Sequence, residues 1–272
     1  MKKTISILAA LIVAVACYTQ EYSYEMTLTN KIVGDNISCW NVDAFENILL
    51  SDQSNLTKFN SNGEVLYKIS NKSFGVIKQI IPITPMKIVL FSEQQQQICF
   101  LDNTLTQVES CIDLDLYQID LATYTARSGR GDNLWVFDQI NSKILLIDLK
   151  NPGKILQEIR NLNGLIQQDE IVNMFEFQSE LFILDAQNKL NKFDLYGNLL
   201  SQENTQYTNG AYSENSLWFF KKNELFLKNE GEFSPLNCFV PFDKIENFRV
   251  IDSRFYFQQQ NEIQVFNLVK KK

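Results

Sequence analysis

The sequence predicts an all-β fold built from six repeated four-stranded units. The first observation is an internal near-copy, since the segment Asp52–Gly63 (DQSNLTKFNSNG) returns as Asp185–Gly197 (DAQNKLNKFDLYG). The second observation is an apolar run that occurs six times, at starting positions 36 to 47 residues apart. The six runs are Ile48–Leu50, Ile88–Leu90, Leu134–Val136, Leu181–Ile183, Leu217–Phe219 and Phe255–Phe257. This spacing is near the length of one four-stranded propeller blade and too irregular for a helical solenoid.

Each unit has the same order of strands and turns. A short polar turn leads into the apolar run, and a second turn leads into a strand such as Leu56–Phe59 or Leu190–Phe193. A glycine then marks the next reversal, because a turn position with positive φ favours this residue. An amphipathic strand such as Val65–Ile69 follows it. The glycines in question are Gly63, Gly153, Gly197 and Gly231.

One further apolar strand precedes each polar turn and completes the unit. The clearest examples are Ile37–Val42, Ile77–Ile83, Ile171–Phe177 and Phe248–Ile251. Four strands per unit, short turns and almost no helical periodicity predict a six-bladed β-propeller with four antiparallel strands per blade.

The two ends of the chain are expected to close the ring together. After Ile263–Leu268 the chain ends, which leaves the last unit one outer strand short. The alternating segment Met26–Ile32 belongs to no complete unit and can supply that strand, removing the exposed edge of an open ring. Residues 25–272 are therefore expected to form one propeller domain, with residues 17–24 as a tether or flexible N-terminus.

The repeat length, the strand order and the Asp/Leu/Phe/Gly pattern resemble six-bladed β-propellers of the NHL-repeat and Tol-associated (TolB-like) kind. The resemblance covers essentially the whole mature chain. The WD dipeptide of WD40 blades and the double glycine of kelch blades are both absent from the units.

Residues 1–16 are predicted to be a signal peptide. Lys2 and Lys3 precede an apolar stretch from Ile5 to Ala16, which ends in the small-x-small sequence Ala14-Val15-Ala16. The stretch is too short to span a bilayer, and no other segment predicts a transmembrane helix.

Cys17 directly follows the predicted cleavage site, where a bacterial lipoprotein carries its lipid anchor. The sequence Ala-Val-Ala-Cys resembles a bacterial lipobox, with Ala where that motif usually has Leu. Two alternatives stay open: a lipid-anchored protein of the cell envelope, or a plain secreted protein cut at the same bond.

The mature chain is acidic, with a net charge of about −9 after residues 1–16 are removed. A surface of this sign repels phosphate backbones, so no nucleic-acid partner is expected. The chain also contains no histidine. This excludes Ser-His-Asp and Cys-His nucleophile systems and the usual zinc and copper ligand sets.

Two functions of different class follow. The first is a non-catalytic exported scaffold or receptor module that binds another protein and needs no cofactor. The second is a calcium-dependent lactonase or esterase, because the resemblance extends to six-bladed lactonase and phosphotriesterase-like propellers, which hold calcium in the central channel through Glu, Asn and Asp side chains. The candidate ligands, in or beside the expected innermost strands, are Asp43, Asp120, Glu176 and Asp252.

Three further expectations concern single side chains. Cys99 and Cys111 flank a predicted hairpin centred near Leu105, so they are expected to form a disulfide across adjacent strands, the alternative being two small buried hydrophobes. Trp135 and Trp218 occupy an apolar repeat position and are expected to pack between blades. Trp40, on an expected innermost strand, is the candidate aromatic residue of the channel.

Overall fold

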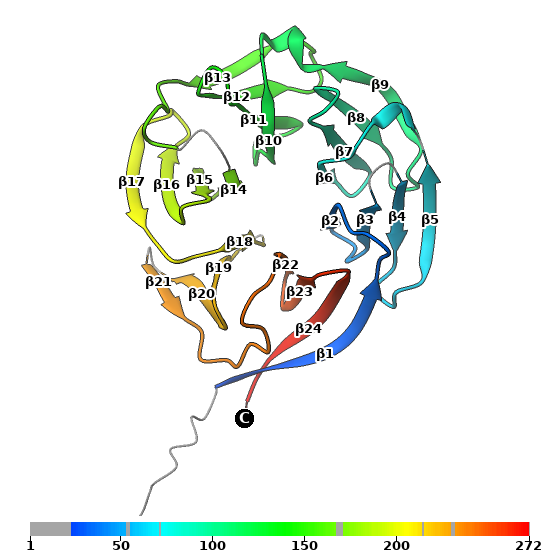
Figure 1. The fold of residues 1–272 in the computed structure, drawn as a ribbon, viewed down its shortest axis with the longest axis vertical. Coiled ribbons are helices and arrows are strands. Elements are labelled where there is room, and N and C mark those ends of the chain that lie inside the picture. The colour runs from blue at the N-terminus through cyan, green and yellow to red at the C-terminus, as the bar shows by residue number, and fades with distance from the viewer. Residues whose placement is uncertain are drawn as a thin grey trace, which may run out of the picture.

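The computed structural model describes residues 23–52, 55–70, 72–166, 171–213, 215–229 and 232–271. These residues form six four-stranded sheets, and neighbouring strands within each sheet are antiparallel. Figure 1 shows the sheets arranged as blades around a common centre, with one strand of each blade innermost and one at the rim. The predicted fold class is confirmed.

The strands follow chain order from the centre to the rim in the first five blades. Blade 1 contains β2 (Cys39–Val42), β3 (Ile48–Asp52), β4 (Asn55–Phe59) and β5 (Val65–Ser70), and blade 2 contains β6 (Gln79–Thr84), β7 (Lys87–Ser92), β8 (Gln97–Leu101) and β9 (Gln107–Asp113). Blade 3 contains β10 (Ala122–Arg127), β11 (Asn133–Asp138), β12 (Lys143–Asp148) and β13 (Ile155–Ile159), and blade 4 contains β14 (Ile171–Phe177), β15 (Glu180–Asp185), β16 (Lys189–Asp194) and β17 (Leu199–Asn204). Blade 5 contains β18 (Asn209–Tyr212), β19 (Leu217–Lys221), β20 (Glu224–Asn229) and β21 (Glu232–Pro235). Two short 3₁₀ helices, η1 (Lys72–Phe74) and η2 (Leu114–Tyr117), lie in connections between blades.

Blade 6 is built from both ends of the chain. Its inner strands are β22 (Asn247–Ile251), β23 (Arg254–Gln259) and β24 (Glu262–Lys270), and its outer strand is β1 (Tyr24–Val33). The β1–β24 pairing runs from Tyr24 opposite Lys270 to Val33 opposite Glu262. The predicted closure of the ring is confirmed, and the paired region is longer at both ends than the sequence suggested.

The hydrophobic core lies between the blades, because each sheet buries both faces against its neighbours. One buried cluster joins Val89 and Phe91 of blade 2 to Leu145 and Ile147 of blade 3. Trp135 is 0% exposed and Trp218 is 6% exposed. Their predicted packing role is therefore confirmed.

The turns between third and outermost strands show why glycine recurs there. Gly63, Gly153 and Gly197 have φ of 83°, 85° and 91°, in the left-handed region that glycine adopts without a steric cost. Gly231, predicted to play the same part, lies outside the described residues.

The described residues form no helix that is long and apolar enough to cross a membrane.

Each face of the ring has its own kind of connection. Because strands within a blade alternate in direction, every turn from an innermost to a second strand lies on the same face, which we call the first-turn face. Its turns are residues 43–47, 85–86, 128–132, 178–179, 213 with 215–216, and 252–253. The opposite face, which we call the crossover face, carries the connections between blades and the turns from second to third strands.

Candidate functional site

The four predicted calcium ligands do not come together, so the predicted metal site is wrong. Asp43, Glu176 and Asp252 lie toward the first-turn face in blades 1, 4 and 6, whereas Asp120 lies in the connection entering blade 3 on the crossover face. Among the described residues, no three Asp, Glu or Cys side chains gather closely enough to hold a metal ion.

Asp43 is neutralised by a lysine of its own blade. Its carboxylate lies 2.8 Å from the Lys58 ammonium group, and both side chains are 3% exposed. The same carboxylate accepts hydrogen bonds from the backbone N–H groups of Phe45 and Asn47, at 2.9 Å each. Its oxygens are therefore already occupied in shaping the first turn of blade 1.

Glu176 and Asp120 are likewise occupied by neighbouring polar groups. The buried Glu176 carboxylate accepts hydrogen bonds from the Ser128 hydroxyl and the Trp135 indole, both at 2.7 Å, and so joins blade 4 to blade 3. Asp120 accepts a hydrogen bond from the Asn141 amide at 2.7 Å. Asp252 is exposed in a turn, with φ of 52°. These carboxylates therefore lie in separate places around the ring, and Glu176 and Asp120 are already engaged by protein donors.

Trp40 is not a residue of the channel wall, which corrects the sequence prediction. It is 2% exposed and belongs to a buried cluster that joins blade 1 to blade 6. Its indole N–H donates to the Gln258 side chain at 2.7 Å, and the Arg249 guanidinium lies over its ring, 5.5 Å from the centroid. Strand alternation explains the error, because Trp40 packs into the boundary with the preceding blade. Its neighbour Asn41 instead donates to the Ile80 carbonyl oxygen of the following blade and accepts from Arg249 of the preceding one.

Cys99 and Cys111 form a disulfide between β8 and β9, with their Cα atoms 4.2 Å apart. The free cysteines among the described residues are Cys39 and Cys238. Burial is the main cause that raises the pKa of the Cys39 thiol to about 12 and that of Cys238 to about 11. Neither thiol is a nucleophile at neutral pH. Cys17, the lipidation candidate, and the predicted signal peptide lie outside the described residues.

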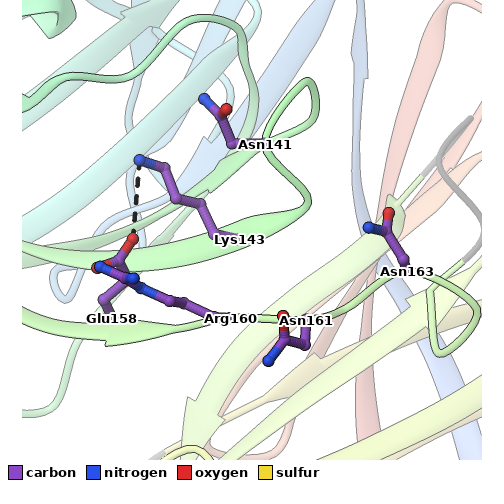
Figure 2. Close-up of a pocket in the computed structure, with 6 residues that line it drawn as sticks. All are labelled: Asn141, Lys143, Glu158, Arg160, Asn161 and Asn163. Atoms are coloured by element: carbon purple, nitrogen blue, oxygen red, sulfur yellow. Dashed lines mark hydrogen bonds and ion pairs between the residues drawn. The ribbon is translucent and has the colours of Figure 1, made fainter.

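A polar hollow of about 310 Å³ opens on the crossover face beside blade 3. Figure 2 shows its lining side chains, which come from the turn before β12, from β12 and β13, and from the connection that follows. The lining residues are Asn141, Lys143, Glu158, Arg160, Asn161 and Asn163.

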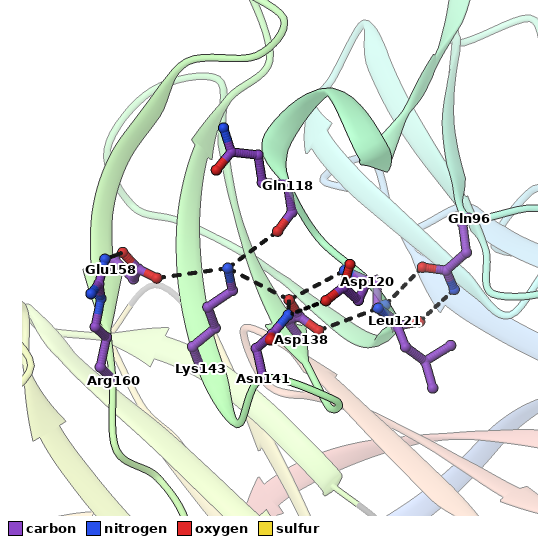
Figure 3. A network of polar contacts seen from close by, with 10 residues as sticks. Gln96, Gln118, Asp120, Leu121, Asp138, Asn141, Lys143, Glu158 and Arg160 are labelled. Atoms are coloured by element: carbon purple, nitrogen blue, oxygen red, sulfur yellow. Dashed lines mark hydrogen bonds and ion pairs between the residues drawn. The ribbon is translucent and has the colours of Figure 1, made fainter.

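The charged groups of this hollow are held by a network that extends inward from it (Figure 3). The Lys143 ammonium lies 3.7 Å from both Asp138 and Glu158 and donates to the Gln118 carbonyl oxygen at 3.2 Å. Asp138 in turn accepts from the backbone N–H groups of Asp120 and Leu121. The network fixes the entry to blade 3, so we assign the hollow a structural role.

The innermost strands form a second polar system around the ring centre. At each blade boundary, a side chain of one innermost strand hydrogen-bonds to the neighbouring blade or to the segment that leads into it. The residues are Asn41 (to Ile80), Gln79 (to Thr125), Tyr124 (to Val172), Asn173 (from Gly210), Asn209 (to Ile245) and Arg249 (to Asn41). These bonds give partners to backbone polar groups of the innermost strands and of the segments that lead into them, and they link each blade to the next.

The first-turn face combines exposed apolar groups with arginines. Phe45 and Met86 occupy the first turns of the adjacent blades 1 and 2 and are 58% and 60% exposed. Arg127 and Arg130 lie at and just after the end of the innermost strand of the next blade, and both are exposed. Aromatic, methionine and arginine side chains are enriched in protein interfaces. The sequence pattern did not single out this face, because turn tips carry no periodic signal.

No family model matches the sequence, and no curated protein matches it. Solved structures match its fold along almost the whole chain. The WD40 domain of Neurospora crassa Pan2 is 8% identical, with a TM-score of 0.64 over 93% of this chain and 98% of that one. Virginiamycin B lyase from Staphylococcus aureus is 12% identical, with a TM-score of 0.59 over 93% of this chain and 97% of that one. The RRP9 WD40 repeats are 8% identical, with a TM-score of 0.64 over 90% and 100%. At these identities the likeness establishes the β-propeller fold.

Proposed function

We propose that this chain is an exported, non-catalytic β-propeller that binds another protein through the first-turn face. The observation that carries the proposal is the pair of large apolar side chains, Phe45 and Met86, exposed on adjacent turns of that face. Aromatic and methionine side chains are enriched in protein interfaces relative to the rest of the surface.

The electrostatics of the same face favour a partner with acidic residues. Arg127 and Arg130 belong to blade 3, which follows the two blades that carry Phe45 and Met86. The overall charge of the protein is negative. Exposed arginines on a protein of negative overall charge can pair with acidic residues of a partner. The dispersed and hydrogen-bonded carboxylates described above give no support to the hydrolase alternative.

Export and the relation to NHL-repeat or TolB-like propellers belong to the proposal as well. The N-terminal sequence supports export through its Lys2-Lys3 start, its apolar stretch and its Ala14-Val15-Ala16 cleavage pattern. Intact mass of the mature N-terminus separates the two modes of export. An added lipid on Cys17 indicates the anchored form, and an unmodified Cys17 in the medium indicates the secreted form.

The interface is tested by cross-linking and pull-down from envelope and secreted fractions with the Phe45→Ser/Met86→Ser variant. We expect the double variant to lose the partner that the wild-type protein recovers, because a few exposed side chains supply much of the binding energy of an interface. Ile140→Ser is the matched control, since Ile140 is 62% exposed in a turn of the crossover face. Recovery of the same partner by all three proteins contradicts the proposed face, and a wild type that stays monomeric under mild cross-linking contradicts the proposed function.

A further inference from the structure

The chain contains three Asn-x-Ser/Thr motifs, which are acceptor sequences for N-linked glycans in exported proteins. A chain with 27 asparagines produces such motifs by chance, so the structure has to decide which of them is suited to carry a glycan. Asn71 lies outside the described residues, and the acceptor residues of the other two motifs are described. The three motifs are Asn36-Ile37-Ser38, Asn55-Leu56-Thr57 and Asn71-Lys72-Ser73.

The two described motifs lie at the same end of blade 1. Asn36 is in the connection that leads from β1 at the rim to the innermost strand β2, on the crossover face (Figure 1). Asn55 begins β4, directly after the turn from the second to the third strand, which lies on the same face. Backbone contacts join both motifs to the end of β3, because Ser38 N–H donates to the Ser51 carbonyl oxygen at 2.9 Å and Asn55 pairs with Asp52.

Asn36 is exposed at a bend in a connection that the neighbouring strands hold in place. Gly34 N–H donates to the Asn261 carbonyl oxygen at 2.8 Å, and the Asn261 amide donates to the Asp35 carbonyl oxygen at 3.1 Å. Ile37 packs against the buried cluster that joins blades 1 and 6. In the described part of the chain, the Asn36 side chain makes no hydrogen bond. A group attached to Asn36 therefore displaces no protein contact.

Asn55 has different surroundings. Its side chain is only half-exposed, and its backbone pairs with Asp52 of β3 on one side and with Ser70 of β5 on the other. A branched sugar group on this residue would have to leave the sheet between two neighbouring strands. Of the two described motifs, the structure therefore favours Asn36 as the site of a glycan.

The face that carries Asn36 is opposite the face of the proposed interface. Phe45 and Met86 are exposed on the first-turn face, and none of the described turns of that face contains an Asn-x-Ser/Thr motif. A glycan is bulky and hydrated. At Asn36 it hinders the approach of a partner to the crossover face beside blade 1 and leaves the first-turn face uncovered.

We infer that Asn36 carries an N-linked glycan on the crossover face of the ring. The donor is an oligosaccharide linked to a polyisoprenyl diphosphate. The Asn36 amide nitrogen forms a bond to C1 of the first sugar, the bond from C1 to the diphosphate oxygen breaks, and the amide gives up one proton as the polyisoprenyl diphosphate leaves. The inference rests on the export in the proposed function and deepens it, because it assigns one face of the ring to the glycan and the other to the partner.

The first measurement is the intact mass of the protein that its own cells export, before and after treatment with a peptide N-glycosidase. We expect the treatment to lower the mass to that of the polypeptide. The enzyme converts a glycosylated asparagine to aspartate, so peptide mapping after digestion in heavy-oxygen water locates the acceptor. We expect the labelled aspartate at position 36.

Variants of the full chain, expressed through a eukaryotic secretory pathway, test the motif itself. Asn36→Gln and Ser38→Ala should both lose the glycan, because the first removes the acceptor nitrogen and the second removes the hydroxyl that defines the motif. Ser38→Thr restores a hydroxyl and should keep the glycan. Asn55→Gln is the matched control, since it removes the other described motif, and its glycan at Asn36 should stay.

Three results overturn the inference: an exported protein whose mass the glycosidase leaves unchanged, a glycan of wild-type mass on Asn36→Gln, or one on Ser38→Ala. None of them involves a protein partner. A protein exported without a glycan leaves the proposed interface untouched, and a glycosylated protein that recovers no partner leaves this inference untouched. The two failures are therefore distinguishable.

Discussion

The carboxylate of Asp43 and the ammonium group of Lys58 are 2.8 Å apart in a site where each side chain is 3% exposed. The pair joins the first turn of blade 1 to its third strand. Lys58 also donates to the Asn103 carbonyl oxygen of blade 2 at 3.1 Å. A residue that the sequence placed among metal ligands is thus a structural link between strands and between blades.

Removing one member of this pair should destabilise the protein strongly. Asp43→Asn leaves the Lys58 charge buried without a counter-ion, and we expect a loss of about 3–5 kcal/mol in the free energy of unfolding. Asp252→Asn, at an exposed turn position, should cost within about 0.5 kcal/mol. Urea denaturation measures both. A stability of Asp43→Asn equal to that of the control would show that the pair contributes nothing.

Closure of the ring should depend on β1. A chain that begins at Gly34 lacks the strand paired with β24, so it exposes a long edge and the buried Ile32 contact is lost. We expect several kcal/mol to be lost from a total of about 5–15 kcal/mol. A chain that begins at Tyr22 keeps the pairing and should unfold at the wild-type temperature. Identical melting temperatures for the two truncations would be incompatible with this assignment.

Calcium should leave the melting temperature unchanged. A ligand that binds only the folded protein stabilises it by mass action, but the four candidate carboxylates lie in separate places and three of them are held by protein partners. Thermal unfolding in millimolar calcium and in chelator is the measurement. A reproducible rise with calcium would reopen the hydrolase alternative.

The buried thiols should make the protein less stable at alkaline pH. The pKa of Cys238 is raised from 9.0 to about 11, mainly by burial, so the unfolded chain loses this proton at a lower pH than the folded chain does. The stabilising free energy that the buried, protonated thiol contributes is fully present below about pH 9 and is lost as the pH rises through about 11. Cys238→Ala should therefore flatten the decline in unfolding free energy between pH 8 and 11. An unchanged slope would mean that this thiol does not contribute.

Much of the fold was predictable because its determinants repeat along the chain. The runs at Ile48 and Leu181 have the same place in blades 1 and 4, since the same burial pattern is needed wherever a second strand packs between two blades. The disulfide partners Cys99 and Cys111 are twelve residues apart, within one hairpin, where turn position alone brings them together.

The candidate site was not predictable in the same way. Trp40 meets Gln258 across 218 positions of sequence, at the boundary between the first and last blades. Arg249 meets Asn41 across 208 positions at the same boundary. The period of a strand shows that alternate residues face opposite sides, but it does not show which side faces the next blade.

The number of units, the strand order within each unit and the closing role of Met26–Ile32 could be predicted from the sequence, because local hydrophobic periodicity and turn chemistry encode them. The pairing of Asp43 with Lys58, the burial of Trp40 and the hydrogen bond from Arg249 to Asn41 are seen only once the chain is folded. These relations depend on how six sheets are rotated about a common centre. This arrangement places polar side chains from different repeats next to one another. The pattern within a single repeat carries no information about which side chains of other repeats will be its neighbours.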